Sequence, residues 1–254
     1  MKRFNVDQLN VQVWQSREEI GTSAAKQVAA QVNEMLQVKN EVNIIFAAAP
    51  SQSEFLAALL NILDIEWHRI NAFHMDEYIG LDADAPQTFG RFLKTRLFDL
   101  KSFKSVYYID PRDPENECSR YAKLLEKCPP DIVCLGIGEN GHLAFNDPPV
   151  ADFNDPKRVK IVMLDEACRR QQVNDGCFRL LDDVPKKAIT LTIPTLLSAR
   201  YLSCVVPGVA KANAVKNTLL SEISTSCPAS ILRNHSNAML FLDGQSSNLI
   251  SKFA

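Results

Sequence analysis

The sequence predicts an α/β fold with a mostly parallel, doubly wound sheet, and two observations support this prediction. Short apolar runs recur along the 254 residues, and segments with the spacing of an amphipathic helix separate them. The runs are apolar on both faces, which is typical of strands covered by helices in a parallel sheet. Strands that alternate with helices favour right-handed crossover connections. We therefore expect ligands to bind beyond the carboxyl ends of the strands.

Short, apolar segments rich in β-branched residues are predicted to be strands. In chain order they are VNIIFAAA (42–49), SVYYID (105–110), DIVCLG (131–136), VKIVML (159–164), AITLTI (188–193), YLSCVVP (201–207) and AMLFLD (238–243). The segment NAFHMDEYIGL (71–81) follows another apolar stretch, so Asp76 and Glu77 are expected at a further strand end. A solvated pair of loop carboxylates is the alternative interpretation of these two residues.

The segments between the strands carry the period of a helix. They are EEIGTSAAKQVAAQVNEMLQ (18–37), SEFLAALLNIL (53–63), TFGRFLKTRLF (88–98), ENECSRYAKLLEK (115–127) and GVAKANAVKNTLL (208–220). Before the first predicted strand, the chain is expected to form one long helix over residues 18–37 and no helix-turn-helix. No repeat, low-complexity tract or linker marks a boundary, so we expect one domain over residues 1–254.

Composition excludes several classes of protein. With 46% hydrophobic and 23% charged residues, the chain is typical of a soluble globular protein, and its net charge of -2 argues against nucleic-acid binding. No apolar run reaches the roughly 18–20 residues of a membrane span, and the N-terminus lacks the apolar region of a secretory signal. The seven cysteines form no C-x-x-C pair. We therefore expect free thiols in the cytoplasm, and no metal site or disulfide framework.

A glycine motif follows the predicted strand 131–136. Gly136-x-Gly138-x-x-Gly141 has the spacing of a dinucleotide-binding turn, but Pro148 comes too soon for the crossover helix that such a turn requires. We therefore expect a sharp turn whose backbone N–H groups face a ligand and which presents His142 at a strand end. A histidine that merely hydrogen-bonds a loop is the alternative.

A second candidate site lies where the predicted strand 42–49 gives way to a helix. Ser51, Gln52 and Ser53 occupy this junction, where free N–H groups and the positive end of the helix dipole can bind an anion. Without further context, the same residues could simply cap the helix.

Two segments, HMDEYIGL and LGIGENGHLAFNDP, resemble the signature segments of the glucosamine-6-phosphate deaminase (isomerase) family. The likeness continues in RVKIVMLDEACRRQQ, VPKKAITLTIPTLLSAR and VPGVAKANAV. The related 6-phosphogluconolactonases share the glycine turn and the histidine but typically continue G-H-T-A-S-L, where this chain reads G-H-L-A-F-N. The resemblance implies a Rossmann-like three-layer α/β/α fold without a nucleotide cofactor. It also implies conversion of glucosamine 6-phosphate to fructose 6-phosphate and ammonia.

The resemblance assigns roles that fit the chemistry of the residues. A neutral imidazole, with an ordinary pKa near 6.5, suits proton exchange during opening of the sugar ring, and His142 is expected to supply it. A carboxylate suits the transfer of a proton from C2 to C1, and Asp76 matches this group. Glu77 is expected beside the substrate or as a structural neighbour of Asp76. Gly138 and Gly141 are expected to line the substrate site.

Two members of the expected catalytic set depart from the family pattern. Asn140 stands where the family often has aspartate, and it can orient His142 by a hydrogen bond but cannot stabilise an imidazolium by charge. Asp147 stands where the family has glutamate, so its side chain is shorter by one methylene and its carboxylate lies about 1.5 Å closer to the backbone. A displacement of this size can cost about a hundredfold in rate unless the loop compensates.

The expected phosphate site also departs from the pattern. Pro50 removes one N–H donor from the loop that ends in Ser51, Gln52 and Ser53. Lys211 matches the family's phosphate-binding lysine. Counting along the chain puts Gln172 where the family has a phosphate-binding arginine, and a small shift would bring Arg170 to that place.

A regulatory segment of some family members is altered as well. It reads Arg158-Val159-Lys160-Ile161 here, with the usual threonine lost. We expect activation by an amino sugar to be weak or absent.

Other functions fit part of the pattern. A 6-phosphogluconolactonase-like hydrolase or an isomerase of another sugar phosphate would use the same phosphate site, whereas a non-catalytic sugar-phosphate-sensing domain would need only binding. In each case the expected partner is a small-molecule sugar phosphate. Binding to a nucleic acid or a membrane is not expected. The sequence leaves the oligomeric state open, a homo-oligomer included.

Overall fold

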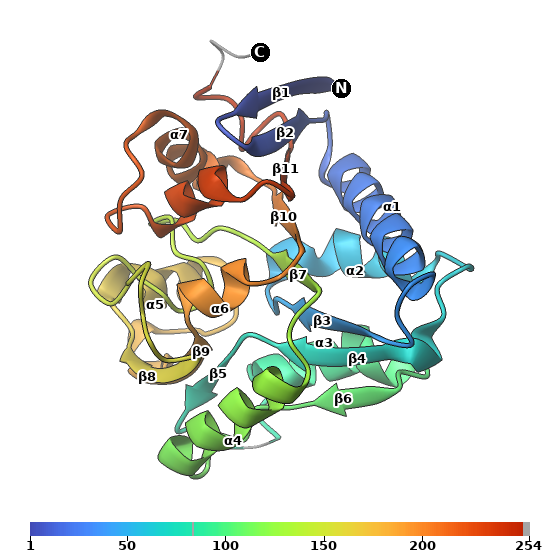
Figure 1. Cartoon of the computed structure of the whole chain (residues 1–254). Helices are drawn as coiled ribbons and strands as arrows, with labels where there is room; N and C mark the ends of the chain where they lie inside the picture. The colour runs from blue at the N-terminus through green and yellow to red at the C-terminus, as the bar shows by residue number, and fades with distance from the viewer. Residues whose placement is uncertain (83, 251–254) are drawn as a thin grey trace.

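A computed structural model describes residues 1–82 and 84–250 (Figure 1). The predicted domain 1–254 thus includes residues outside the described part. None of the helices in the described part combines the length and apolar character needed to cross a membrane.

The helices and strands alternate along most of the chain. In order they are β1 (Lys2–Val6), β2 (Leu9–Val13), α1 (Arg17–Leu36), β3 (Val42–Phe46), α2 (Ser53–Leu60), β4 (Ile70–His74), β5 (Asp76–Ile79), α3 (Phe89–Arg96), β6 (Ser105–Tyr107), α4 (Pro114–Lys127), β7 (Ile132–Leu135), β8 (Val159–Met163), α5 (Glu166–Asn174), β9 (Lys187–Leu191), α6 (Ile193–Leu197), β10 (Tyr201–Val206), α7 (Ala212–Leu220) and β11 (Ala238–Leu242).

The central sheet confirms the predicted doubly wound α/β fold. Its strand order is β1-β2-β11-β10-β7-β3-β4-β6, and every neighbouring pair except β1 and β2 is parallel. The order of the strands reverses between β3 and β7, which lie side by side. In open α/β sheets such a reversal is where ligands bind, in a crevice at the carboxyl ends of the strands.

Helices cover both faces of the sheet, which gives the predicted three-layer arrangement (Figure 1). One apolar cluster joins α1, α2 and α3 to one face, and the other joins α4, α6 and α7 to the opposite face. Successive strand residues alternate between the clusters. Ile44 belongs to the first cluster and Ile45 to the second, as expected for a strand buried on both sides.

Helix α1 shows how the sequence fixes one of these layers. Ser16 caps the helix and forms a capping box with Glu19, so the helix begins at Arg17. Gly21 allows close contact with α2, because a Cβ atom there would lie 2.8 Å from the backbone of Glu54 and Phe55.

Two predicted strands do not belong to the central sheet, which corrects the prediction. Strands β8 and β9, predicted as 159–164 and 188–193, form with β5 a separate antiparallel sheet of order β5-β9-β8 (Figure 1). Apolar character on both faces indicates burial but does not say which sheet buries the strand. The pairing of β5 with β9 connects the expected Asp76 segment to this smaller sheet.

The N-terminal prediction was also incomplete. Residues before α1 form a β-hairpin of β1 and β2, in which Asp7 adopts a left-handed conformation with φ of 49°. Strand β2 then pairs in parallel with β11 at the edge of the central sheet. The hairpin escaped prediction because β1 is a largely exposed edge strand with few apolar residues.

Candidate active site

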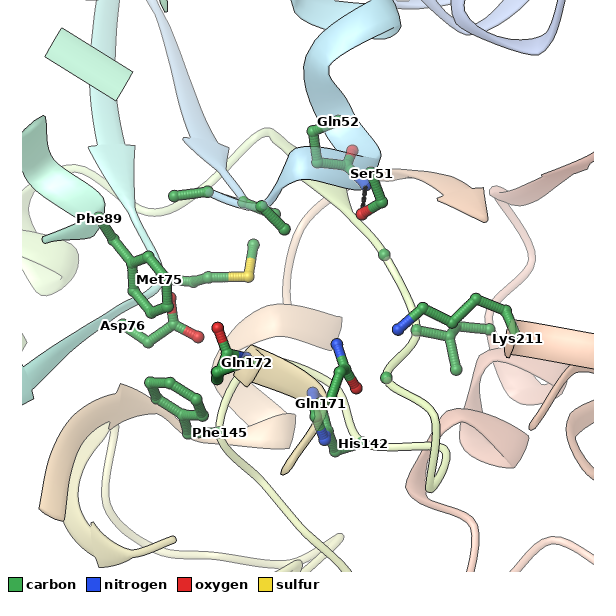
Figure 2. A pocket seen from close by; sticks show the side chains of 17 residues that line it. Ser51, Gln52, Met75, Asp76, Phe89, His142, Phe145, Gln171, Gln172 and Lys211 are labelled. Atoms are coloured by element: carbon green, nitrogen blue, oxygen red, sulfur yellow. Dashed lines mark hydrogen bonds between the residues drawn. The ribbon is translucent and has the colours of Figure 1, made fainter. Parts of the chain in front are cut away.

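A cavity lies at the point where the strand order reverses, between the segments that follow β3 and β7. Its volume is about 510 Å³ including the open mouth. It is lined by Ala47, Ala48, Ala49, Ser51, Gln52, Met75, Asp76, Phe89, Gly136, Ile137, Gly138, His142, Ala144, Phe145, Gln171, Gln172 and Lys211 (Figure 2). The predicted residues Asp76 and His142, which are far apart in the sequence, thus share one cavity.

The glycine motif forms the predicted sharp turn and not a dinucleotide site. No helix follows Gly141 before residue 166. Gly138 must lack a side chain because a Cβ atom would lie 2.2 Å from the ring of His142. Gly141 has a φ of 86°, and its Cβ atom would lie 2.7 Å from the sulfur of Cys227. The absence of a side chain at Gly138 therefore allows the imidazole of His142 to lie against the turn. Both glycines were predicted to line the substrate site, and Gly138 lines the cavity whereas Gly141 does not.

The expectation that the amides of this turn face a ligand was wrong for two of them. The N–H of Gly138 donates to the carbonyl of His142, and the N–H of Gly141 donates to the carbonyl of Gly138. Both donors are consumed in holding the turn itself. The turn therefore presents the His142 side chain and contributes no anion-binding nest through these amides.

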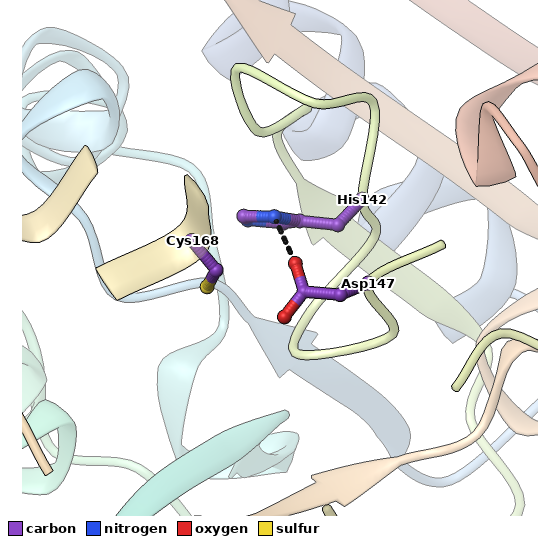
Figure 3. Close-up of side chains that lie close together, drawn as sticks. All are labelled: His142, Asp147 and Cys168. Carbon is purple, nitrogen blue, oxygen red and sulfur yellow. Dashed lines mark ion pairs between the residues drawn. The ribbon is translucent and has the colours of Figure 1, made fainter. Parts of the chain in front are cut away.

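His142 is held by a group of buried side chains behind the cavity (Figure 3). Its Nδ1 lies 2.9 Å from Oδ1 of Asp147, a short contact that is not well aligned as a hydrogen bond. The amide of Asn140 donates to the same Oδ1 atom over 3.0 Å, while its carbonyl oxygen accepts the backbone N–H of His142. Asn140 and Asp147 thus lie outside the cavity wall and position the histidine from behind. The shorter Asp147 side chain still reaches the ring.

The surroundings of Asp147 favour its charged form. Burial raises the pKa of this carboxyl, but contact with His142 and hydrogen bonds from Asn140 and Cys168 outweigh burial and leave the pKa below its ordinary value. An ionised Asp147 keeps a proton on Nδ1 of His142 and leaves Nε2 as the nitrogen available to a ligand.

Asp76 lies two residues beyond the carboxyl end of β4, where it was expected, and it is also the first residue of β5. Burial, together with the charge of Glu77, raises its pKa well above the ordinary range. His74, which was not among the predicted site residues, contacts the backbone of Asp76. Nδ1 of His74 contacts the carbonyl oxygen of Asp76 at 2.9 Å, and its Nε2 accepts the N–H of Ile109. Burial lowers the pKa of His74 to about 4, so this ring is a neutral positioning group.

Glu77, predicted beside the substrate, is directed away from the cavity. Its carboxylate accepts the backbone N–H groups of Tyr78, Phe89 and Gly90, the last two at the start of α3. It therefore caps α3, because Thr88, the N-cap residue, makes no side-chain capping bond. Phe89, held in this way, forms part of the cavity wall.

The residues predicted to bind phosphate separate into two groups. Ser51, Gln52 and Lys211 line the cavity, and Ser51 and Lys211 lie at the end opposite Asp76 (Figure 2). Ser53 does not line the cavity. Its backbone N–H donates to the carbonyl of Pro50, so this N–H is not available to a phosphate group. Arg170 also lies outside, on the exposed face of α5, where it pairs with Glu166.

Two glutamines of α5 take the place that Arg170 was expected to fill. Gln171 and Gln172 are buried and line the cavity. The signal in the sequence was the count along the chain that put Gln172 in the register of a phosphate-binding residue. Helix α5 itself was not predicted, so the face on which these residues lie could not be assigned.

One group of side chains in the described part of the chain could hold a metal ion. The ligand atoms of His142, Asp147 and Cys168 lie within 4.8 Å of one another. Burial and then the charge of Asp147 raise the pKa of the Cys168 thiol well above its ordinary value, which keeps the sulfur protonated. An ion would also have to separate His142 from Asp147, so the arrangement fits a chain of proton-bearing groups better than a ligand set.

Comparison with known proteins identifies the family. Residues 15–241 match the model of the family described as glucosamine-6-phosphate isomerases/6-phosphogluconolactonase. A relative from Listeria innocua, named glucosamine-6-phosphate deaminase, is 32% identical over 229 residues, which cover 89% of this chain and 96% of the relative. The chain belongs to this family.

Two further deaminases are similar to the chain, one by sequence and one by solved structure, and a more distant structure shares its fold. A glucosamine-6-phosphate deaminase from Bacillus cereus is 34% identical over 247 residues, covering 96% of this chain and 90% of that protein. The solved structure of a monomeric glucosamine-6-phosphate deaminase superposes with a TM-score of 0.84 at 31% identity, covering 94% of this chain and 99% of that one. A 6-phosphogluconolactonase from Thermotoga maritima, with a TM-score of 0.76 at 19% identity over 92% of this chain and 99% of its own, shares the fold.

Proposed function

We propose that this protein converts glucosamine 6-phosphate and water into fructose 6-phosphate and ammonia. The observation that carries the proposal is the state of Lys211. This lysine is 6% exposed and lines the same cavity as Asp76 and His142, and its ammonium group has no hydrogen-bond or ion-pair partner within residues 1–82 and 84–250. A buried cation without a partner is unfavourable unless a ligand brings an anion to it. The deaminases to which the chain is similar act on such an anionic sugar.

The phosphate group of the sugar would bind at the Lys211 end of the cavity. Burial lowers the pKa of Lys211, and the dianion would offset that effect by stabilising the ammonium form. Ser51 adds a hydroxyl group at the same end, in the turn that leads into α2. The N-terminal end of α2 favours negative charge there.

His142 is proposed to open the sugar ring. Ring opening moves a proton from the hydroxyl at C1 to the ring oxygen, which a single imidazole nitrogen can do by accepting and returning a proton. Because Asp147 and Asn140 fix the ring from behind, Nε2 is the nitrogen that can meet the substrate.

Asp76 is proposed to carry the isomerisation. Its carboxylate would take the proton from C2 of the open-chain amine and return it to C1, which converts the C1 aldehyde and C2 amine into an imine at C2. Burial makes this carboxylate a stronger base than a solvated one, because burial raises its pKa. Addition of water to the imine and loss of ammonia leave the ketone of fructose 6-phosphate.

The cytoplasm is the proposed location. All seven cysteines are free in the structure, as a reducing compartment would keep them.

The direct test is to supply purified protein with glucosamine 6-phosphate and measure ammonia and fructose 6-phosphate together. Equal amounts of the two products are expected. Lys211→Met should raise KM strongly, since it removes the cation at the phosphate end. Faster hydrolysis of 6-phosphogluconolactone, or isomerisation of another sugar phosphate without ammonia release, would replace this proposal with one of those functions.

A further inference from the structure

Gln172 is a buried polar residue without a partner. The residue is 7% exposed and lines the cavity, and its side-chain amide makes no hydrogen bond within the described residues. The neighbouring Gln171 differs, because its carbonyl oxygen accepts the N–H of Glu139 at 2.7 Å and its amide donates to Asp175. The side-chain amide of Gln172 therefore opens into the cavity with its hydrogen-bonding groups unused by the described residues. A ligand in the cavity can engage it.

The position of Gln172 indicates which part of the ligand it meets. Figure 2 shows Gln172 toward the end of the cavity that holds Asp76 and Phe145, with Lys211 at the other end. Cys168 lies one turn earlier on the same face of α5, so this face of the helix is directed toward the interior of the protein. The amide thus lies nearer the proton-transfer group than the phosphate end.

We propose that Gln172 is a specificity-determining residue that hydrogen-bonds the hydroxyl group at C3 of the bound sugar, next to the reacting carbons C1 and C2. The inference rests on the proposed function in taking the ligand to be a sugar phosphate. It goes beyond that function by assigning the recognition of the sugar, as distinct from its phosphate, to a neutral side chain of α5. An amide is suited to this task because it can both donate to and accept from a hydroxyl group.

The test compares the binding of two probes, fructose 6-phosphate and inorganic phosphate, by titration calorimetry. Gln172→Met keeps the length of the side chain and removes its hydrogen-bonding groups. We expect it to weaken fructose 6-phosphate binding about three- to tenfold, the usual effect of one lost hydrogen bond, and to leave phosphate binding unchanged. Lys211→Met should weaken both probes. Arg170→Met is the matched control on α5 and should weaken neither.

A second measurement uses the unaltered protein, so that it does not depend on folding of the variant. An analogue of fructose 6-phosphate without the C3 hydroxyl should bind three- to tenfold more weakly than the parent, and Gln172→Met should add no further loss, because both changes remove the same hydrogen bond. Full additivity of the two losses would overturn the inference. So would unchanged sugar binding in Gln172→Met, or an equal loss of phosphate binding.

Failure of the proposed function gives a different result. Absence of ammonia release from glucosamine 6-phosphate would refute the deaminase proposal, while the effect of Gln172→Met on fructose 6-phosphate binding could still be measured. Normal deamination with unaltered sugar binding in the variant would refute only the role of Gln172.

Discussion

Asp76 and Glu77 are neighbours in β5, yet their carboxylates have different surroundings. Successive side chains of a strand point to opposite faces, so Asp76 enters the cavity while Glu77 meets the start of α3. Burial raises the pKa of Glu77 to about 7, although the N–H groups of Gly90, Phe89 and Tyr78 act to lower it. The carboxylate of Asp76 therefore faces the cavity, whereas that of Glu77 caps α3 and adds negative charge beside Asp76.

Replacement of Asp76 by asparagine tests the proton-transfer role. The amide has nearly the same shape but cannot accept a proton, so we expect kcat to fall about 10²- to 10⁴-fold, the usual contribution of a general base. Binding of fructose 6-phosphate should change little. The measurement is the rate of ammonia release at saturating substrate, beside calorimetric binding of the product. A variant with a near-normal rate would show that another group moves the proton.

Glu77→Gln tests the charge beside Asp76. Because the charge of Glu77 helps to raise the pKa of Asp76, its removal should lower that pKa. Asp76 must be ionised to accept a proton, so activity is lost as pH falls through its pKa. The acid limb of the kcat/KM profile should therefore move to lower pH in the variant.

The control for Glu77→Gln is Glu166→Gln, which removes an exposed carboxylate from α5. Its profile should match that of the unaltered protein. A Glu77→Gln profile with an unmoved acid limb would mean that the two carboxylates do not interact electrically, whatever happens to stability.

At the scale of elements, the connection from β4 to β5 carries the central sheet into the smaller sheet and depends on His74. Tyr121 of α4 accepts the N–H of His74 and donates to its carbonyl oxygen, while the ring of His74 supports Asp76 and Ile109. These bonds tie α4 and the segment after β6 to the end of β4, and through the His74 ring to the start of β5. The neutral ring is therefore part of the support for Asp76.

His74 should make stability depend on pH. Its pKa is about 4 in the folded protein and near 6.5 when unfolded, so its contribution is fully present above pH 6.5 and is lost as pH falls toward 4. Between pH 7.5 and pH 5 this amounts to about 2 kcal/mol. Urea unfolding should show this loss in the unaltered protein relative to His74→Gln, which does not titrate.

The comparison must be between these two proteins at each pH. Asp76 and Glu77 act in the opposite direction, since carboxyl groups with raised pKa stabilise most when protonated and lose that contribution as pH rises. Equal slopes for the two proteins between pH 7.5 and pH 5 would mean that His74 is not held neutral.

The elements differ in how far the sequence could predict them. Helix α1 was predicted closely because its apolar period is long. Helix α5 was not, since its sequence EACRRQQVN has few apolar residues and shows no period. The sheet to which β8 and β9 belong could not be predicted, because pairing depends on the path of distant β5.

Across the protein, the sequence could predict the site residues that follow strand ends. It could not predict those whose position depends on which face of a helix is buried. The cavity forms where β3 and β7 adjoin, so Ser51 and His142 were expected at one edge of the sheet. Whether Arg170 or Gln172 faces that edge depends on the rotation of α5 about its axis. Two residues correspond to about half a turn, which exchanges the buried face for the exposed one.

The groove between α4 and β8 contains the segment that is regulatory in some family members. Lys160, which lines this groove, pairs with Asp155 at 2.9 Å and donates to the carbonyl of Val150, while Arg158 pairs with Glu126 at 3.5 Å. Burial raises the pKa of Asp155, but Lys160 outweighs burial and holds that pKa below its ordinary value. An anionic effector would have to displace this internal carboxylate, so we expect N-acetylglucosamine 6-phosphate to leave the substrate saturation curve hyperbolic and without activation. Initial rates across a range of effector concentrations provide the measurement, with competition at the cavity recognised by a raised KM alone. A strong fall in KM or a rise in kcat on adding the effector would show that the groove still communicates with Asp76 and His142.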